Sequence, residues 1–253
     1  MKTISVMSRK GGSGKTTTAL ALIYGLAQMN YKVLAIDLDP QLNLTYSLEG
    51  DPTLTPADFV LKTKHISPLP QQARQNIYLI PGSKDLTTAD IKFTDIGKQY
   101  RLKEALAEVS SKYDYCIIDN CTHLGITAVN SLTASDYVIV PATADTYSMQ
   151  GVLELVTQII HPVQKYTNKK LQFSGVLITM FDERKTISRT IRSQLQKYVT
   201  SMNSKVFETV IHSSVAIQEA QLTRDNLLLY GNGKSRAIQD YNSFIAEFLG
   251  GIK

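Results

Sequence analysis

The stretch "SRKGGSGKTTT" (Ser8–Thr18) decides most of what this sequence predicts. It begins at the end of the apolar run "TISVMS" (3–8) and leads into a segment with helical periodicity. The phosphate loops of nucleotide-binding proteins follow the pattern G-x-x-x-x-G-K-[ST]. This loop ends as the pattern requires, but it has Arg9 in place of the first glycine and an additional lysine, Lys10, before its glycine pair. The stretch therefore predicts a phosphate site, and the second lysine needs an explanation.

A strand, a glycine-rich turn and a helix, in that order, are the context in which such a loop binds phosphate. Glycines let consecutive backbone N–H groups converge on phosphate oxygens, and the N-terminus of the following helix adds partial positive charge. Lys15 is expected to reach the β- and γ-phosphates of ATP, and the hydroxyl of Thr16 to bind Mg²⁺. The loop residues expected to contact the nucleotide are Gly11, Gly12, Ser13, Gly14, Lys15, Thr16 and Thr17.

The composition limits the class of protein. The chain has 253 residues, of which 43% are hydrophobic and 19% are charged, enough to bury the core of one α/β domain. No apolar run reaches the roughly 18 residues of a membrane span and no signal-peptide pattern opens the chain, so a cytoplasmic protein is expected. Two cysteines, Cys116 and Cys121, make neither a disulfide framework nor a zinc site. The net charge of +5 is compatible with nucleic acid or an anionic membrane as a partner.

Apolar runs alternate with helical patterns along the chain. Most of the runs are continuous, which is typical of strands buried on both faces of a parallel sheet. Apolar residues recur at helical spacing in 15–29, 102–109, 152–159 and 187–202. The pattern predicts an α/β fold with a doubly wound, mostly parallel sheet and helices on both faces. The expected strands are 3–8, 32–39, 76–82, 113–119, 136–142, 173–180 and 205–211.

No repeat or linker divides the sequence, so a single domain over 1–253 is expected. The chain opens directly on its first strand, and no helix-turn-helix domain is expected before the phosphate loop. Residues 50–75, which contain several prolines, are expected to form an irregular excursion with one short helix.

Carboxylates follow two of the expected strands. "AIDLDPQ" places Asp37 and Asp39 at the end of one strand, where side chains at i and i+2 point to the same face. "YCIIDN" places Asp119 at the end of another. Such a carboxylate can bind Mg²⁺ or orient a water molecule toward the γ-phosphate, although it can also simply cap the next turn. Beside the phosphate loop, the metal reading is favoured, with Thr16, Asp39 and Asp119 as candidates.

These motifs together resemble those of a known family. "KGGSGKTTT" is similar to K-G-G-x-G-K-[ST], the deviant Walker A loop of the ParA/MinD ATPases, and the resemblance extends over essentially the whole chain. In that family the first lysine reaches across a nucleotide-sandwich dimer to the phosphates of the partner subunit. The resemblance therefore implies that Lys10 contacts ATP in trans. A cation supplied by the partner couples hydrolysis to dimerisation because it neutralises charge in the transition state.

Further segments extend the resemblance. "VLAIDLDPQLN" resembles the family motif D-x-D-P-Q-G-N, whose second aspartate is associated with positioning water. The resemblance thus implies catalytic roles for Lys10, Lys15 and Asp39 and a supporting role for Asp37. "FSGVLITMFDERKTISR" and "VFETVIHSSVAIQEAQ" resemble ParA-type segments near the adenine pocket. The base contacts that this implies are Met180, Ser213 and Ser214.

The chain departs from the family's pattern at two places. The Walker B region usually reads D-[CT]-P-P, whereas this chain has "DNCTHLG" (119–125). That turn relays the state of the γ-phosphate, so the departure bears on the rate of hydrolysis and its coupling to the dimer. The segment "VIHSSV" (210–215) stands where the family more often has a proline and an asparagine or aspartate, and it bears on the base contacts.

A basic segment distinguishes between members of the family. Residues 184–207 carry six basic side chains and no acidic one. Lys185, Arg189 and Arg192 form a basic stripe opposite an apolar face that begins at Ile187. Such a stripe suits sequence-independent binding of DNA phosphates. The alternative is a solvated helix face that binds no ligand. The residues expected to bind DNA are Lys185, Arg189 and Arg192 in this stripe and Arg224 further along the chain.

The resemblance implies a ParA-like ATPase with ATP and Mg²⁺ as cofactors. Such a protein forms a homodimer on ATP binding, coats non-specific double-stranded DNA at the nucleoid, and hydrolyses ATP slowly until a ParB-like centromere-binding protein stimulates it.

Two alternatives remain: a MinD-like membrane-cycling ATPase, whose branch ends in a basic amphipathic helix, and a metabolic P-loop enzyme such as a carboxylate-activating synthetase. The last segment, "DYNSFIAEFLGGIK", carries Glu247 and two glycines and is expected to pack rather than to bind a membrane.

Overall fold

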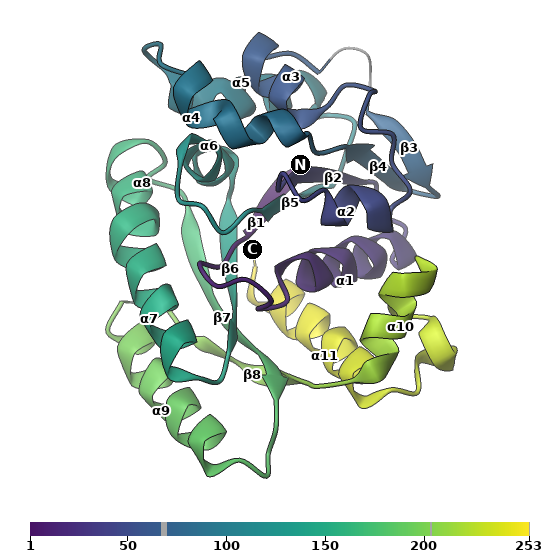
Figure 1. Ribbon diagram of the computed structural model, residues 1–253, viewed down its shortest axis with the longest axis vertical. Coiled ribbons are helices and arrows are strands. Elements are labelled where there is room, and N and C mark those ends of the chain that lie inside the picture. Colours follow the sequence, from purple (N-terminus) through teal and green to yellow (C-terminus); the bar gives the residue numbers. More distant parts are fainter. Residues whose placement is uncertain (67–69, 203, 253) are drawn as a thin grey trace.

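The computed structural model describes residues 1–66, 70–202 and 204–252. In this part of the chain one eight-stranded sheet runs through the molecule with the order β3-β4-β2-β5-β1-β6-β7-β8 (Figure 1). Neighbouring strands are parallel except β3 and β4, which pair antiparallel at one edge. The strands are β1 (Lys2–Val6), β2 (Val33–Leu38), β3 (Gln71–Arg74), β4 (Ile77–Ile80), β5 (Tyr115–Asn120), β6 (Tyr137–Thr143), β7 (Gln172–Phe181) and β8 (Val206–His212).

Helices cover both faces of this sheet, which confirms the predicted doubly wound α/β fold (Figure 1). One face carries α1 (Lys15–Gln28), α2 (Asn43–Ser47), α10 (Val215–Thr223) and α11 (Arg236–Gly251). The other face carries α3 (Ala57–Thr63), α4 (Ala89–Lys92), α5 (Arg101–Val109), α6 (Ile126–Ala134), α7 (Thr146–Leu155), α8 (His161–Tyr166) and α9 (Thr186–Thr200). Short 3-10 turns occur at Lys84–Thr88, Lys98–Tyr100 and Tyr230–Gly233, and a π-helical turn, Val156–Ile160, joins α7 to α8.

The central strands are apolar on both faces because helices bury both. Along β2, Val33 and Ala35 pack on the α1 side, whereas Leu34 and Ile36 pack on the α5 side, and all four are fully buried. Side chains alternate between the faces of a strand, so a strand covered on both sides reads as a continuous apolar run. This is the physical reason why the sequence shows runs rather than alternation.

The strand order places the carboxyl ends of β1, β2 and β5 next to one another. The chain passes from β1 to β2 on one side of β1, and later from β5 to β6 on the other side, so the direction of winding reverses at β1. In doubly wound folds, ligands bind at the carboxyl ends of the strands where this reversal occurs. The register pairs Val6 with Asp119 and Asp37 with Asp119 at that edge.

Two details differ from what the sequence predicts. The excursion 50–75 contains the expected short helix, α3, but also the edge strand β3, which the prediction missed; residues 67–69 lie outside the described chain. The apolar face of α9 does not begin at Ile187, because that side chain is exposed and Ser188 is buried in its place. The turn into α9 rotates the first apolar residue outward, which a periodic pattern alone cannot detect.

The last helix, α11, is part of the core. Tyr241, Phe244 and Phe248 are among the largest fully buried side chains, and Phe244 and Phe248 pack against Phe207 of β8. This agrees with the expectation that the segment packs; Lys253 lies outside the described residues. In the part of the chain that the structure describes, no helix combines the length and hydrophobicity needed to cross a bilayer.

Glu247 connects α11 to the edge strand of the sheet. Its carboxylate accepts the backbone N–H groups of Glu208 (2.9 Å) and Thr209 (3.0 Å) on β8. Burial by itself would raise the pKa of Glu247, but the N–H groups of Thr209 and Glu208 outweigh it, and the pKa lies below its ordinary value. The contact satisfies backbone donors that an edge strand would otherwise leave unpaired.

We expect Glu247→Gln to lower the free energy of unfolding by about 1–2 kcal/mol at pH 7, because one charged acceptor is lost from two N–H bonds. Since the folded pKa is depressed, the contribution is complete above the unfolded pKa and disappears as the pH falls through the folded pKa. Urea unfolding at pH 7 and at successively lower pH measures the difference between wild type and variant, which should shrink on acidification. Glu208→Gln is the matched control, since the Glu208 side chain is 91% exposed; an equal loss in both variants would contradict the prediction.

Candidate active site

The loop after β1 forms a cradle of backbone amides. Gly12 (φ 69°) and Gly14 (φ 86°) have left-handed backbone, and α1 begins at Lys15 directly after Gly14. The hydroxyl of Thr179 on β7 donates to the carbonyl of Ser13 (2.8 Å). A Cβ added to Gly14 would lie 3.4 Å from the Thr179 side chain. The loop is therefore clamped against β7, with the first N–H groups of α1 beside it, as phosphate binding requires.

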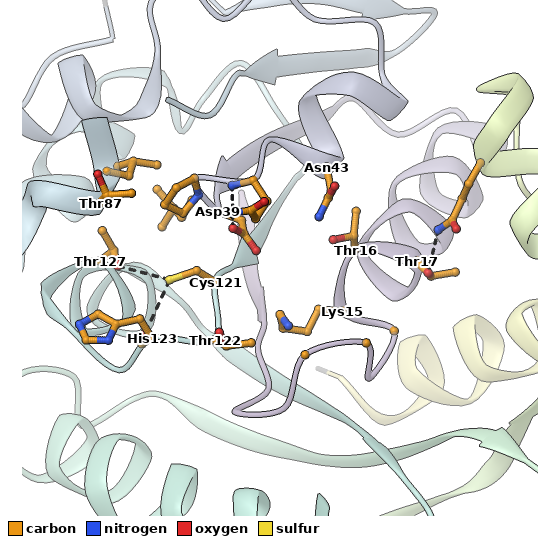
Figure 2. A pocket seen from close by; sticks show the side chains of 18 of the residues that line it. Lys15, Thr16, Thr17, Asp39, Asn43, Thr87, Cys121, Thr122, His123 and Thr127 are labelled. Atoms are coloured by element: carbon orange, nitrogen blue, oxygen red, sulfur yellow. Dashed lines mark hydrogen bonds between the residues drawn. The ribbon is translucent and has the colours of Figure 1, made fainter. Parts of the chain in front are cut away.

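A cavity of about 710 Å³ opens over this loop. Figure 2 shows Lys15 directed into the cavity, with Asp39, Cys121 and Thr122 around the same space. Of the residues expected to contact the nucleotide, Gly11, Gly12, Gly14, Lys15, Thr16, Thr17 and Met180 line the cavity. Ser13 is instead fully buried beneath the loop, and within the part of the chain that the structure describes its hydroxyl has no hydrogen-bond partner.

Thr16 and Asp119 are brought together beneath the cavity. The hydroxyl of Thr16 donates to Oδ2 of Asp119 (2.7 Å). Asp119 is fully buried, and its other oxygen, Oδ1, has no hydrogen-bond partner among the described residues. An orphaned carboxylate oxygen beside a threonine hydroxyl fits a hydrated Mg²⁺. Among the described residues, no three His, Cys, Asp or Glu side chains could hold a metal ion by themselves, so such an ion would depend on phosphate oxygens as well.

Asp37 holds the turn between β2 and α2. Its buried carboxylate accepts the hydroxyl (2.7 Å) and backbone N–H (2.9 Å) of Thr45 and the N–H of Asp39 (3.0 Å). The Thr45 hydroxyl also accepts the N–H of Gly82 (2.8 Å). The lone pairs of Asp37 are thus used within the protein, which fits the supporting role expected for it.

The turn that follows presents Asp39 to the cavity. The carboxylate of Asp39 accepts the N–H of Gln41 (2.9 Å), and its carbonyl accepts the N–H of Leu42 (2.9 Å). Leu42 has left-handed backbone (φ 62°) at the position where the motif it resembles has glycine. A buried leucine in this conformation is strained, so the packing around it must hold the turn in place.

The pKa values of both buried aspartates are raised. Burial raises the pKa of Asp119, the charge of Asp37 raises it further, and the Thr16 hydroxyl and Lys15 lower it without restoring its ordinary value. Burial also raises the pKa of Asp37, although its bonds from Thr45 and Asp39 oppose the shift. A divalent cation next to Asp119 would supply the positive charge that this pair lacks.

Lys10 does not line the cavity but is held within its own subunit. Its ammonium lies 2.6 Å from Oδ2 of Asp145 and donates to the hydroxyl of Thr143 (3.2 Å). Asp145 is also the N-cap of α7 and accepts the N–H of Ser148 (2.9 Å). Its burial would raise its pKa, but the bonds from Lys10, Thr143 and Ser148 lower the pKa to about 2.

A second cavity, of about 220 Å³, adjoins the first at the end of β7 and β8. Met180, Ser213 and Ser214, the expected base contacts, line it together with Ile217. Met180 has left-handed backbone (φ 51°), a strain that concentrates at functional sites. The size and the apolar lining fit a nucleotide base, whereas Ser214 is engaged in capping α10 through the N–H of Ala216 (3.2 Å).

The structure separates the residues expected to bind DNA. Lys185, Arg189 and Arg192 lie at the start and along α9, whereas Arg224 ends α10 beside Thr16 and Gln221 in a different part of the molecule (Figure 1). Two acidic side chains that lie just outside the segment 184–207 in the sequence are close to its arginines in space. Asp182 pairs with Arg184 (2.9 Å), and the carboxylate of Glu208 lies 3.7 Å from Arg192.

Sequence reasoning missed several residues of the cavity. Gln221 donates to the hydroxyl of Thr17 (2.9 Å) and borders both cavities, because Ser214, Ile217 and Gln221 share one side of α10. Helical spacing from the expected contact Ser214 would have identified it. Other residues of the larger cavity lie in segments that a motif marks: Gln41 and Asn43 in the D-x-D-P-Q-G-N motif, and Cys121, Thr122 and His123 in the Walker B turn. Thr87 and Thr127 also line it and lie in segments that no motif marks.

The Lys10–Asp145 contact can be tested directly. In Lys10→Ala we expect the pKa of Asp145 to move from about 2 toward the ordinary value near 4. The reason is that the ammonium supplies a charged hydrogen bond to the carboxylate. Carbon NMR of the Asp145 carboxyl during an acid titration measures this shift. Arg9→Ala is the matched control, since Arg9 pairs with Glu154 instead, and an unchanged Asp145 titration in Lys10→Ala would contradict the contact.

Comparisons with known proteins agree with this geometry. A family described as AAA domain matches residues 1–173. The chain is 34% identical over 245 residues to the sporulation initiation inhibitor protein Soj of Bacillus subtilis, covering 95% of each chain. It is 32% identical over 244 residues to the chromosome partitioning protein ParA of Myxococcus xanthus, covering 94% of this chain and 84% of that protein.

Two solved structures are similar to the fold as well as to the sequence. A plasmid partition protein of Borrelia burgdorferi bound to AMPPNP has a TM-score of 0.82 at 25% identity, covering 99% of both chains. The cobyrinic acid a,c-diamide synthase of Mycobacterium smegmatis with bound ADP and magnesium has a TM-score of 0.78 at 30% identity, covering 98% of this chain and 94% of that one. With its deviant phosphate loop, its parallel sheet and these relatives, the chain belongs to the ParA/MinD family of P-loop ATPases.

Proposed function

We propose that this chain is a ParA-like ATPase that binds ATP with Mg²⁺, forms a sandwich homodimer and drives segregation of a plasmid or chromosome on non-specific DNA. The observation that carries the proposal is the convergence of Lys15, Thr16 and Asp39 on one cavity, with Asp119 beneath it. The partition proteins among its relatives support the same direction.

In this proposal the phosphate end of the cavity performs the chemistry. Lys15 and the loop amides would bind the phosphates, and Thr16, Asp119 and Asp39 would hold Mg²⁺, which would supply positive charge to the phosphate oxygens. Asp39 would also orient the attacking water. Thr122 and Cys121 replace the proline turn of the family, so a slow basal rate is expected until a partner stimulates the enzyme.

The lysine that opens the loop acts across the dimer. Lys10 is engaged by Asp145 and Thr143 within its own subunit, so it must exchange these contacts before it reaches phosphates bound by a partner subunit. The pair is more than one third exposed, and such surface pairs contribute at most about 1 kcal/mol. The exchange is therefore compatible with a dimer that forms only on ATP binding.

The DNA-binding surface of the proposal is α9 with the residues before it. Lys185 and Arg189 are exposed and form no ion pair among the described residues. Arg189 donates to the backbone carbonyl of Glu183, and Arg192 donates to that of Glu208. In a dimer the surface occurs twice, and the affinity for DNA rises with the number of phosphates neutralised. Arg224, separated from this surface, is proposed as an accessory contact at the crevice beside the nucleotide.

The proposal includes a ParB-like centromere-binding protein that stimulates hydrolysis, and a cytoplasmic, nucleoid-associated location. A MinD-like membrane cycle is disfavoured because α11 contributes its apolar side chains to the core. A metabolic P-loop enzyme is the second candidate, favoured by the likeness to cobyrinic acid a,c-diamide synthase. The two candidates differ in one measurable property, the ATP-dependent binding of DNA.

We expect Asp39→Ala to retain binding of ATP and ATP-dependent dimerisation but to lose at least 90% of hydrolysis. The carboxylate orients water and does not bind the phosphates themselves. Calorimetry with ATP, sedimentation and phosphate release measure the three properties. Lys15→Ala, which removes the phosphate contact, should lose all of them. An Asp39→Ala protein that binds no ATP would refute this division of roles.

We expect tight, salt-sensitive binding to random-sequence duplex DNA with ATP and little binding with ADP or without nucleotide. A salt series in each nucleotide state measures it, since the slope against log salt reports the phosphates contacted. Arg189→Glu with Arg192→Glu should reduce affinity and slope while dimerisation remains. The matched control is Lys169→Glu with Lys170→Glu, a charge reversal in the turn between α8 and β7. Absence of DNA binding in all three states would exclude the partition function and favour the metabolic candidate.

A further inference from the structure

The turn between β5 and α6, residues 121–125, borders the part of the larger cavity that contains Lys15. It directly follows the β5 segment that ends with the buried Asp119 and its neighbour, and Cys121 and Thr122 line the same cavity (Figure 2). The turn contains no proline, so its backbone lacks the restriction that a proline ring imposes. Its position therefore depends on contacts with other segments.

Asp90 of α4 supplies such contacts. Its Oδ1 accepts the backbone N–H of Ile126, the first residue of α6 (2.6 Å). Its Oδ2 accepts a hydrogen bond from Nε2 of His123 (2.8 Å). The N-cap of α6 is Gly125, which has no side chain to satisfy the first N–H groups of the helix. Asp90 therefore caps this helix from a different segment of the chain.

Gly125 also fits closely against the carboxylate. A Cβ added to Gly125 would lie 2.7 Å from Cγ of Asp90, which is closer than two carbon atoms in contact can approach. The backbone of Gly125 is extended (φ −94°), a conformation that other residues adopt without strain. The glycine is thus needed for the approach of Asp90 and not for the conformation of the turn.

The segment 82–90, which leads to Asp90, is fixed at its other end as well. The N–H of Gly82 donates to the hydroxyl of Thr45 (2.8 Å), and that hydroxyl donates to Asp37 (2.7 Å). Between its ends, the segment packs into the same apolar cluster as β2 and β5. It therefore connects the turn that follows Asp37 to the turn at the end of β5.

We propose that Asp90 is a positioning residue for ATP hydrolysis, which holds turn 121–125 so that Asp119 and Thr122 keep their places at the cavity. The inference rests on the proposed function and adds to it a residue that acts through this turn. Without the carboxylate, the N–H of Ile126 loses its partner and the turn can open locally. The phosphate contacts of Lys15 lie on another segment, so hydrolysis is affected and the affinity for ATP is not.

The position of the turn can be measured without hydrolysis, through Cys121. The chain has two cysteines, of which Cys116 is fully buried and Cys121 is half-buried in the turn. Modification of the nucleotide-free protein by dithionitrobenzoate therefore reports Cys121. We expect Asp90→Ala to accelerate the modification about three- to tenfold, the effect of losing one hydrogen bond. Asp85→Ala is the matched control and should react as wild type does, because Asp85 lies on the same segment but faces Lys92 (3.7 Å).

Gly125→Ala perturbs the same contact from the other side. Its methyl group displaces the carboxylate of Asp90, so this variant should react with dithionitrobenzoate about as fast as Asp90→Ala. Combined with Asp90→Ala, where the space is free, Gly125→Ala should add nothing. The single variant Gly125→Ala also keeps the inference testable if Asp90→Ala folds poorly. Additive effects of the two substitutions, or wild-type rates in both single variants, overturn the inference.

Hydrolysis should depend on the position of the turn. We expect Asp90→Ala to lower kcat about 10- to 100-fold, as for residues that support a metal ligand, with less than about a twofold change in the Kd of a non-hydrolysable ATP analogue. Phosphate release and calorimetry measure the two quantities. Asp90→Asn should recover most of kcat, because its Oδ1 still accepts the N–H of Ile126. A Kd that rises in proportion to the loss of kcat overturns the inference.

The two assays together separate failure of the inference from failure of the proposed function. If the modification rates follow the expected order but wild type hydrolyses no ATP, the proposed function fails and the inference fails with it. If wild type hydrolyses ATP and Asp90→Ala changes neither the modification rate nor kcat, only the inference fails. A loss of kcat without faster modification of Cys121 also overturns it, because Asp90 would then act on the reaction directly.

Discussion

The site depends on two carboxylates buried side by side. Asp37 and Asp119 are register partners on β2 and β5, so the sheet itself forces like charges together at its carboxyl edge. The protein compensates each one differently. Asp37 receives three bonds from Thr45 and Asp39, which fix the β2–α2 turn, whereas Asp119 receives only the hydroxyl of Thr16 and keeps one oxygen free. Two buried carboxylates repel each other, and a bound cation offsets this repulsion. A site for Mg²⁺ and a nucleotide needs this preference for a cation.

The ends of the cavity proposed for the phosphates and for the base are built by different parts of the fold. The phosphate end lies over β1, β2 and β5, where the loop is clamped by Thr179 and the Asp39 turn is held through Asp37. The base end lies where β7 and β8 stop, and it is bordered by α10, whose Gln221 reaches back to Thr17.

Charge on this protein has to be judged in space rather than along the chain. The segment 184–207 contains no acidic residue, yet Asp182 and Glu208 lie just outside it and pair with its arginines. Lys10 shows the same effect, since a lysine that the family resemblance directs toward a partner subunit is held by Asp145, more than one hundred residues away in sequence. Local sequence therefore overstates the number of cations available to a phosphate.

The sequence by itself determined the fold class and the phosphate site. Continuous apolar runs require strands buried on both faces, and a glycine-rich turn between strand and helix fixes where the phosphates would lie, because both signals are local. Residues 11–17, Asp39 and Asp119 could be named from these signals, whereas Lys10 was named from the resemblance of the loop to the family. Only the tertiary structure decided the edge strand β3, the exposure of Ile187, the separation of Arg224 from α9, and the capping of α6 by Asp90. These depend on contacts between distant segments, whose geometry is set by packing and leaves no periodic trace in the chain.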